Sequence, residues 1–431
     1  MSVCRIVDAR VHDPFAVLQN RQSHRDSQTE QVVSEIIEDV RKRGDAALIE
    51  SGRKFDSPGL ASILVTDEEM DATRLPTHYS TAIDFAAKRI EDFHTLQLAY
   101  FSEGLESRGG FFGWKHGGVG QRILPLERVG VYVPGGKATY PSSVLMNAIP
   151  ARVAGVGKTF VTTPARSDGT LDPSVLYALK CAGVSQAFKV GGASAVAALA
   201  LGTESVPRVD KIVGPGNRYV NEAKRQLWGK VGLDGYAGPS EVCVLVDSAA
   251  NVEWASADLL TQIEHSEDNA AFLVATSIET LERVLQAVSR QLAGAACETS
   301  MRTALSEQSI AFIATDLSQA IEIVNAIAPE HLTISTAEPE AVLEKVKNAG
   351  AILLGDFTPE SAGDYVLGPS HTLPTSGAAR FGSPVNVLDF LKIQSVSKLT
   401  YDELAELIPT IEAFGEMEGF PTHARGATIR R

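Results

Sequence analysis

The sequence predicts an α/β fold with two consecutive parallel-sheet arrays, flanked by helical segments near the two ends of the chain. Helix-like segments separate four short apolar runs, which lie at 129–133, 158–163, 187–190 and 210–213. The same alternation of apolar runs and helix-like segments continues after the turn GYAGPSE, with runs at 242–247, 271–276, 309–315, 331–335 and 350–354. In the first array the strand starts are 29, 29 and 23 residues apart, a spacing typical of β-α-β units in a parallel sheet.

The N-terminal segment from 26 to 100 is charged and has the period of helices. Its first helix carries apolar side chains on one face, namely Val32, Val33, Ile36, Ile37 and Val40. Gly44 is predicted to end this helix, and a second helix is predicted at 81–97. From about 356 the chain becomes rich in Gly, Pro and Ser, and it closes with a helical tail at 400–418.

Length and composition limit the class of protein. The chain has 431 residues, about three times the usual single-domain length, which predicts two or more domains. Its content of 44% hydrophobic and 21% charged residues excludes disorder, collagen-like repeats and coiled coil. Asp and Glu number 53 against 39 Lys and Arg, and the resulting charge of −14 argues against nucleic acid and anionic membranes as partners.

Targeting and redox signals indicate the compartment. No apolar stretch approaches the roughly 20 residues that span a bilayer. The start, MSVCRIVDAR, lacks the apolar centre of a secretory signal. The cysteines, at 4, 181, 243 and 297, form no C-x-x-C pair, so neither a zinc ribbon nor a disulfide framework is indicated. We therefore expect a cytoplasmic protein with reduced cysteines.

Several familiar motifs are absent. The chain contains no G-x-G-x-x-G dinucleotide fingerprint, no G-x-S-x-G nucleophile elbow and no H-E-x-x-H zinc motif. The run 157–159 (GKT) imitates the end of a phosphate-binding loop. However, Arg152 stands where the first glycine belongs, and the order is helix to strand rather than strand to helix. We reject a phosphate-binding loop there.

Three glycine turns follow predicted strands and precede predicted helices, at 134–136, 191–192 and 214–217. Such turns place backbone N–H groups and a helix N-terminus beside a phosphate. Each turn alone is equally well explained as a tight connection without a ligand. Three turns at matching ends of one array favour a nucleotide or another anionic ligand.

Polar side chains at element ends are candidates for chemistry. Gln262 and His265 are three residues apart on a helix and share a face. Glu330 and His331 stand at a helix-to-strand join, where neighbours on an extended backbone are expected to point to opposite sides.

Three further candidates lie in loops or near the end of the chain. Asp364 and His371 lie in a glycine-containing loop, and His423 lies near the C-terminus. Each of the seven residues taken alone favours an ordinary structural role, and only the fold can bring them together.

The chain resembles the histidinol dehydrogenase family in eight ordered blocks. These blocks are VGVYVPGG, NAIPARVAGV, VDKIVGPGN, AGPSE, LLTQIEH, APEHLTI, TPESAGDYVLGPSHTLPTSGAARF and EGFPTHA. The similarity extends from about residue 30 to residue 430. It implies a zinc-dependent, NAD-linked oxidation of L-histidinol through L-histidinaldehyde to L-histidine, the last step of histidine biosynthesis, with two NAD used per turnover.

The resemblance also implies an architecture. The family is a homodimer with shared active sites and two incomplete Rossmann-like domains. The implied division has four parts: an N-terminal segment at 1–25, a first α/β domain at 26–128 plus 242–382, a second α/β domain at 129–241, and a C-terminal helical segment at 383–431. The first domain would carry most metal and catalytic residues, the second would face the cofactor, and the last would cross to the partner.

Site residues follow from the matching blocks. One Zn²⁺ per subunit would be bound by Gln262, His265, Asp364 and His423. His331 would be the general base for the alcohol, and Glu330 would activate the water that attacks the aldehyde. Substrate contacts would come from Ser240, Gln262, His265, His331, Asp364, His371, Glu418 and His423. Cofactor contacts would come from Tyr132, Ser194 and Asn217.

Two departures from the family pattern stand out. Ser194 replaces a typical Gln, and Gly235 replaces a residue such as Met before AGPSE. The alternative functions are a paralogous NAD-dependent dehydrogenase of another small polyol or amino alcohol, a metal-dependent hydrolase with the same ligands, and a non-catalytic binding protein.

Overall fold

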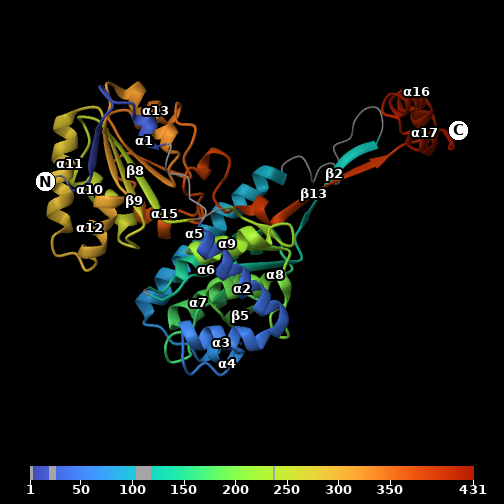
Figure 1. Cartoon of the computed structure of the whole chain (residues 1–431), viewed down its shortest axis with the longest axis horizontal. Coiled ribbons are helices and arrows are strands. Elements are labelled where there is room, and N and C mark those ends of the chain that lie inside the picture. The colour runs from blue at the N-terminus through green and yellow to red at the C-terminus, as the bar shows by residue number, and fades with distance from the viewer. Residues whose placement is uncertain (1–2, 19–25, 103–117, 137, 236–237) are drawn as a thin grey trace. The chain divides into compact units, whose positions relative to one another are not determined.

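The computed structural model describes residues 3–18, 26–102, 118–136, 138–235 and 238–431. The chain forms two compact units (Figure 1). The large unit comprises Met1–Thr95 and Leu126–Phe390, and the small unit comprises Leu96–Pro125 and Leu391–Arg431. The large unit contains both predicted parallel sheets.

One sheet of the large unit has six parallel strands in the order β1-β10-β9-β8-β11-β12. Its strands are β1 (Arg5–Asp8), β8 (Glu241–Val246), β9 (Ala270–Ala275), β10 (Ile310–Ile313), β11 (His331–Ser335) and β12 (Ala351–Leu354). The central strands β8, β9 and β11 are buried along their whole length, as expected for a parallel sheet covered on both faces. The predicted second array is confirmed, and β1 adds a strand from the segment 1–25, which the sequence analysis had left without an element.

Helices cover both faces of the six-stranded sheet (Figure 1). One face packs against α10 (Val252–Ile263), α11 (Ile278–Leu292) and α12 (Glu298–Glu307). The other face packs against α1 (Pro14–Leu18), α13 (Leu317–Ile327) and α14 (Pro339–Leu343). The short helices α15 (Glu360–Tyr365), η3 (Ala378–Arg380) and η4 (Val387–Phe390) follow β12.

The other sheet of the large unit has five parallel strands in the order β5-β4-β3-β6-β7. They are β3 (Arg128–Tyr132), β4 (Lys158–Thr163), β5 (Gln186–Lys189), β6 (Lys211–Val213) and β7 (Gly232–Leu233). The connecting helices are α6 (Pro141–Val153), α7 (Pro173–Ala182), α8 (Gly192–Leu201) and α9 (Arg218–Leu227). The chain runs outward from β3 in both directions, so the topological switch point lies between β3 and β6, where such sheets bind ligands.

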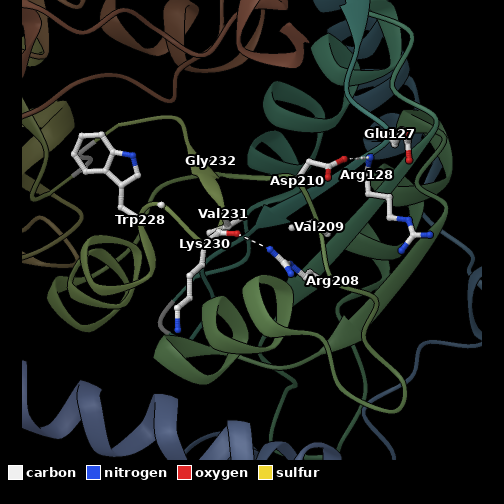
Figure 2. A pocket seen from close by; sticks show the side chains of 10 residues that line it. Glu127, Arg128, Arg208, Val209, Asp210, Trp228, Lys230, Val231 and Gly232 are labelled. Atoms are coloured by element: carbon white, nitrogen blue, oxygen red, sulfur yellow. Dashed lines mark hydrogen bonds between the residues drawn. The ribbon is translucent and has the colours of Figure 1, made fainter. Parts of the chain in front are cut away.

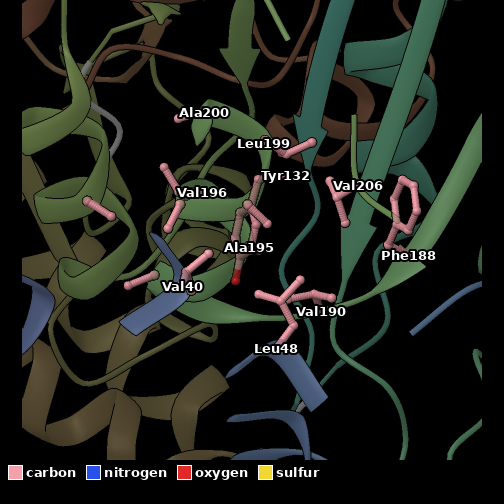
Figure 3. Packing of buried hydrophobic residues seen from close by; sticks show 14 of the residues in the cluster. Val40, Leu48, Tyr132, Phe188, Val190, Ala195, Val196, Leu199, Ala200 and Val206 are labelled. Carbon is pink, nitrogen blue, oxygen red and sulfur yellow. The ribbon is translucent and has the colours of Figure 1, made fainter. Parts of the chain in front are cut away.

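The first two of the four N-terminal helices share a hydrophobic core with this five-stranded sheet. The four are α2 (Ser27–Arg43), α3 (Asp45–Phe55), α4 (Asp67–Ala72) and α5 (Thr77–Ser102). Figure 3 shows Val40 of α2 and Leu48 of α3 in one buried cluster with Val196 of α8 and Phe188 of β5. Gly44 ends α2 as predicted, with φ of 53° and its N–H donated to the carbonyl of Val40.

This packing corrects the domain division for part of the segment 26–128. The sequence analysis joined it to 242–382, whereas α2 and α3 share their core with the sheet formed by residues 128–233. An amphipathic stripe predicts that a helix packs on a core, but not which of two cores it covers.

The small unit pairs two segments that are far apart in the sequence. Strand β2 (Gly118–Pro125) runs antiparallel to β13 (Leu391–Lys398), and the helices α16 (Tyr401–Met417) and α17 (Pro421–Thr428) follow. The segment 383–431 was predicted to be helical, and this prediction is wrong for its first part. That part contains strand β13, which pairs with β2. Within the described residues, no helix is long and apolar enough to cross a membrane.

Candidate active site

The amino ends of β8 and β11, two neighbouring strands of the six-stranded sheet, carry a buried group of titratable side chains. His331 begins β11, Glu330 directly precedes it, and Glu241 begins β8. The backbone N–H of Glu241 donates to Oε2 of Glu330 at 2.8 Å, and the carbonyl of Glu241 lies 3.3 Å from Nδ1 of His331. One residue of β8 thus positions both side chains.

The expectation that Glu330 and His331 point to opposite sides is wrong. Both side chains reach the backbone of Glu241, and Oε2 of Glu330 lies 3.7 Å from Nδ1 of His331. The alternation of a strand does not apply, because Glu330 lies in the bend before β11. At 3.7 Å the two groups interact through charge without a hydrogen bond.

Two further carboxylates surround the other side of the His331 ring. Nε2 of His331 lies 3.5 Å from Oδ1 of Asp364 and 3.9 Å from Oε2 of Glu360. Glu360 is fully buried, and its Oε1 accepts from the hydroxyl of Thr333 at 3.0 Å. Its Oε2 has no hydrogen-bond partner among the described residues. Sequence analysis missed Glu360, although it lies in the block TPESAGDY.

Burial and mutual charge shift the pKa values in this group. Burial alone would lower the pKa of His331, but Glu360, Glu330 and Asp364 outweigh it and raise the pKa to about 10. Burial raises the pKa of Glu330 to about 8 and that of Glu360 to about 7. Burial also opposes the charge of Asp364, yet the hydrogen bond from His331 keeps the pKa of Asp364 below its usual value. Strongly shifted pKa values in one buried cluster are typical of a catalytic site.

Asp364 connects this cluster with the end of α10. Nε2 of Gln262 donates to Oδ2 of Asp364 at 3.1 Å, and the carbonyl of Gln262 accepts from Nδ2 of Asn269 at 2.7 Å. Oδ1 of Asn269 in turn accepts from the backbone N–H of Ser240 at 3.0 Å. Asn269, which sequence analysis also missed, therefore holds the C-terminal end of α10 against the starts of β8 and β9.

His371 links the same cluster to the five-stranded sheet. Its Nδ1 lies 2.8 Å from the carbonyl of Asp364, and its Nε2 lies 3.1 Å from the hydroxyl of Ser143 in the first turn of α6. Burial lowers the pKa of His371, which favours the neutral ring. His371 thus connects the six-stranded and the five-stranded parts of the large unit.

His265, Glu418 and His423 are exposed. His265 lies in the turn after α10, close enough to Asp364 and His371 to influence their charge. His423 lies on α17 with its ring 5.3 Å from that of Phe420, and Glu418 follows α16. Both belong to the small unit, whereas the other predicted site residues belong to the large unit. Among the residues described, no three His, Cys, Asp or Glu side chains form a group that could hold a metal ion.

The predicted cofactor residues lie at the carboxyl edge of the five-stranded sheet. Tyr132 ends β3 and is 3% exposed, and its hydroxyl accepts the backbone N–H of Gly192 at 3.3 Å. Asn217 follows β6 and caps α9, accepting the N–H groups of Tyr219 and Val220. Glycine is required at 214, where φ is +115° and a Cβ would lie 2.1 Å from the carbonyl oxygen of Tyr132.

A buried ion pair holds the turn that contains Gly214. Lys224 lies 2.8 Å from Asp234 and is 2% exposed, and its ammonium donates to the carbonyl of Gly214 at 2.5 Å. Oδ2 of Asp234 accepts the N–H of Gly214 at 2.7 Å. The turn before Asn217 is therefore fixed by two side chains that sequence analysis did not single out.

Ser194, the departure from the family pattern, points into the core. It is 3% exposed, and its hydroxyl lies 2.9 Å from the hydroxyl of Ser51 on α3. The loss of the longer side chain is thus accompanied by a hydrogen bond between α8 and α3. The second departure, Gly235, has φ of +153° and open space where a Cβ would stand.

A hollow of about 580 Å³ lies elsewhere, at the amino ends of β3, β6 and β7 (Figure 2). Figure 2 shows Arg128, Arg208 and Lys230 around it together with Asp210 and Trp228. The N–H of Arg128 donates to Asp210, and Arg208 donates to the carbonyl of Lys230. None of the predicted site residues lines it, so we do not assign the chemistry to this hollow.

Comparison with known proteins gives one consistent family. A family model described as histidinol dehydrogenase matches residues 19–431. A histidinol dehydrogenase of Geobacter metallireducens is 44% identical, and the match covers 100% of this chain and 98% of that protein. A histidinol dehydrogenase of Synechococcus is 42% identical, and the match covers 99% of this chain and 95% of that protein.

A solved structure agrees with this assignment. The crystal structure of histidinol dehydrogenase from Elizabethkingia anophelis superposes with a TM-score of 0.91 at 32% identity, over 100% of this chain and 98% of that one. The two incomplete Rossmann-like sheets are therefore those expected from the resemblance. The chain belongs to the histidinol dehydrogenase family and is an enzyme of the oxidoreductase class.

Proposed function

We propose that the enzyme oxidises L-histidinol through L-histidinaldehyde to L-histidine, with NAD as hydride acceptor and one Zn²⁺ in each subunit. The observation that carries this proposal is the buried group of Glu330, His331 and Asp364 at the amino ends of β8 and β11, joined through Gln262 to the end of α10. A candidate base, a second carboxylate and two candidate metal ligands, Gln262 and Asp364, lie together there, and a two-step oxidation with water would use groups of these kinds.

The residues present fit a zinc ion. Gln262, His265 and Asp364 offer an amide oxygen, an imidazole nitrogen and a carboxylate, which are donors that Zn²⁺ accepts. The side chains of Gln262 and Asp364 are adjacent, because Nε2 of Gln262 donates to Oδ2 of Asp364 at 3.1 Å, and the amide would have to turn to offer its oxygen to the ion. The C-terminal end of α10 adds the negative end of a helix dipole, which stabilises a cation. When bound, the ion would orient the amino alcohol and stabilise its developing negative charge.

His331 is suited to accept the proton of the alcohol as the hydride leaves carbon. Its Nδ1 faces the carbonyl of Glu241, so Nδ1 carries the hydrogen and Nε2 is the basic atom. Three carboxylates hold the ring protonated as the groups stand, with a pKa of about 10. A cation held by Asp364 would cancel one of those charges and would so lower the pKa of His331 toward the range of a general base.

Glu330 is suited to the second step, in which water attacks the aldehyde and a second hydride leaves. Its Oε2 is held by the N–H of Glu241, which leaves Oε1 to accept a proton from water. Burial raises its pKa to about 8 and so makes the carboxylate a stronger base than an exposed glutamate.

The carboxyl edge of the five-stranded sheet fits NAD. Gly136 and Gly192 have φ of +108° and +63°, and a Cβ on either would meet nothing within 4 Å, so the backbone is open to a ligand. Gly192 begins α8, whose first turn has no side-chain cap, and helix N-termini favour the pyrophosphate of a dinucleotide. Tyr132 and Asn217 frame this edge at the ends of β3 and β6.

The composition of the small unit supports a homodimer with shared sites. Its helices bury only three side chains or glycines, Ile408, Gly415 and Ala427. Large apolar side chains are exposed instead, among them Leu407, Phe414, Met417 and Phe420. A two-stranded sheet with two such helices is marginal alone, and its apolar surface is suited to a second copy of the chain. We propose that His423 and Glu418 complete the site of that second copy.

The test is NADH absorbance after addition of L-histidinol to zinc-loaded protein. Two NADH per histidinol are expected, and L-histidinaldehyde should give one. A metal-dependent hydrolase would give none with either compound. A paralogous dehydrogenase would give NADH with another polyol or amino alcohol and little with L-histidinol.

A further inference from the structure

Asp56 carries a half-buried carboxylate at the carboxyl edge of the five-stranded sheet. The residue directly follows α3, and its N–H donates to the carbonyl of Gly52 at 2.9 Å. A Cβ on Gly191 would lie 3.1 Å from Oδ2 of Asp56 and 2.9 Å from Cβ of Pro164. Because Pro164 follows β4 and Gly191 follows β5, the carboxylate lies where the carboxyl ends of these two strands meet.

The segment around Asp56 is tied to the sheet on two sides. The hydroxyl of Ser57, which is fully buried, donates to the carbonyl of Ser167 in the loop after β4. Before it, Ser51 is bonded to Ser194 in the first turn of α8. The chain segment that carries Asp56 is therefore held beside this edge of the sheet.

This carboxylate has no donor of its own. Among the residues that the structure describes, no hydrogen bond or ion pair reaches its oxygens, and burial raises the pKa of Asp56 to about 6. A partly buried carboxylate is unfavourable unless it is hydrogen-bonded. Open space lies next to it, because a Cβ on the adjacent Gly192 would meet nothing within 4 Å. The donors that Asp56 lacks can come from a ligand that enters there.

The position corresponds to a known element of dinucleotide sites. In doubly wound sheets an acidic residue after the second strand accepts hydrogen bonds from the adenosine ribose, and its charge disfavours the 2′-phosphate of NADP. Here β4 is the second strand outward from the switch point, and Pro164 after it has no polar side chain. We propose that Asp56, supplied by the segment after α3, accepts hydrogen bonds from the adenosine ribose and selects NAD over NADP. This inference rests on the proposed use of NAD.

Direct binding tests the inference without turnover. The dissociation constants of NADH and NADPH are measured by cofactor fluorescence on the full-length protein. Asp56→Ala, which removes the acceptor, is expected to weaken NADH about tenfold, as for one charge-assisted hydrogen bond. Asp56→Asn removes only the charge. It is expected to lower the dissociation constant of NADPH relative to that of NADH about tenfold or more.

Glu50→Gln is the matched control. Glu50 lies on α3, the helix that precedes Asp56, and is exposed and paired with Arg43. The substitution therefore removes one negative charge at a distance from the carboxyl edge of the sheet. It should leave both constants unchanged, and circular dichroism should show all variants folded. If wild type binds NADH and the two Asp56 variants keep its constants and ratio, the inference is overturned and the proposed function stands. If wild type binds neither cofactor, the proposed use of NAD is overturned with it.

Discussion

The two parallel sheets of the large unit carry their candidate site residues at opposite edges. In the six-stranded sheet the titratable groups gather at the amino ends of β8 and β11, around Glu330 and His331. In the five-stranded sheet the predicted cofactor residues lie at the carboxyl ends of β3 and β6, at Tyr132 and Asn217. The carboxyl edge of a parallel sheet receives helix N-termini, with free N–H groups and a positive dipole end, which suit an anionic cofactor.

The amino edge receives helix C-termini, which offer carbonyls and the negative end of the dipole. That environment suits a cation, and a site there must be built from side chains rather than backbone N–H groups. Gln262 in the last turn of α10 and the buried cluster of Glu330, His331, Glu360 and Asp364 match this expectation. If the proposed sites are correct, the rule that ligands bind at the carboxyl ends of strands holds for the five-stranded sheet and not for the six-stranded sheet.

Local patterns predicted most of the elements. The period of the strands and the glycine turns depends only on neighbouring residues, so both arrays and the end of α2 at Gly44 are confirmed. Strand β1 was missed because four residues with two apolar side chains give no pattern that separates them from a loop.

The arrangement of the site could not be predicted in the same way. Sequence spacing does not tell that β8 and β11 are neighbours, or that Glu360 lies 3.9 Å from His331. Nor does an amphipathic helix indicate whether Val40 packs on one sheet or the other. The orientation of Ser194 toward Ser51 likewise depends on the tertiary contact of α8 with α3.

Metal removal should have the largest effect on turnover, and it should affect the proposed metal site without affecting the proposed cofactor site. Protein treated with a strong chelator is expected to lose turnover completely and to regain it with Zn²⁺ or Mn²⁺. NADH binding measured by fluorescence should remain, because the carboxyl edge contains none of the proposed ligands Gln262, His265 and Asp364. Full activity in protein shown to be metal-free by elemental analysis would contradict the zinc assignment.

Substitution of Glu330 and His331 should show that these two proposed bases act in different steps of the reaction. Glu330→Gln is expected to slow histidinaldehyde oxidation by about 10²–10⁴-fold, the usual cost of losing a general base, and to affect alcohol oxidation much less. His331→Asn should slow the alcohol step by a similar factor. Single-turnover measurements with each substrate provide the test, and Glu322→Gln on the exposed face of α13 is a neutral control. Equal damage to both steps by Glu330→Gln would refute the division.

A mixed dimer tests whether the amino edge is completed by a second copy. We expect His423→Ala and Glu330→Gln to be nearly inactive as separate homodimers. If His423 acts on the partner's site, a heterodimer has one site with both changes and one with neither, so about half of wild-type activity per dimer should return. Doubly tagged, co-purified heterodimers supply the measurement. Activity that stays near zero in folded heterodimers would mean that His423 acts within its own chain or not at all.

The smallest expected effect concerns Ser194, at the carboxyl edge. Ser194→Gln restores the residue typical of the family and loses the hydrogen bond with Ser51, which is worth about 1 kcal/mol. Because Ser194 is 3% exposed, the longer side chain has to turn toward the open space beside Gly192, where its amide would meet the cofactor. We expect NADH to bind about two- to fivefold more tightly, with unchanged metal content and a slightly lower melting temperature.

Ser51→Ala separates the two consequences of that change. It removes the same Ser51–Ser194 hydrogen bond without adding an amide, so it should lower the melting temperature without tightening NADH binding. If Ser194→Gln behaves in the same way as Ser51→Ala, position 194 serves only the packing of α8 on α3. The carboxyl edge would then bind its cofactor through backbone groups together with Tyr132, Asn217 and Asp56, and position 194 would have no part in it.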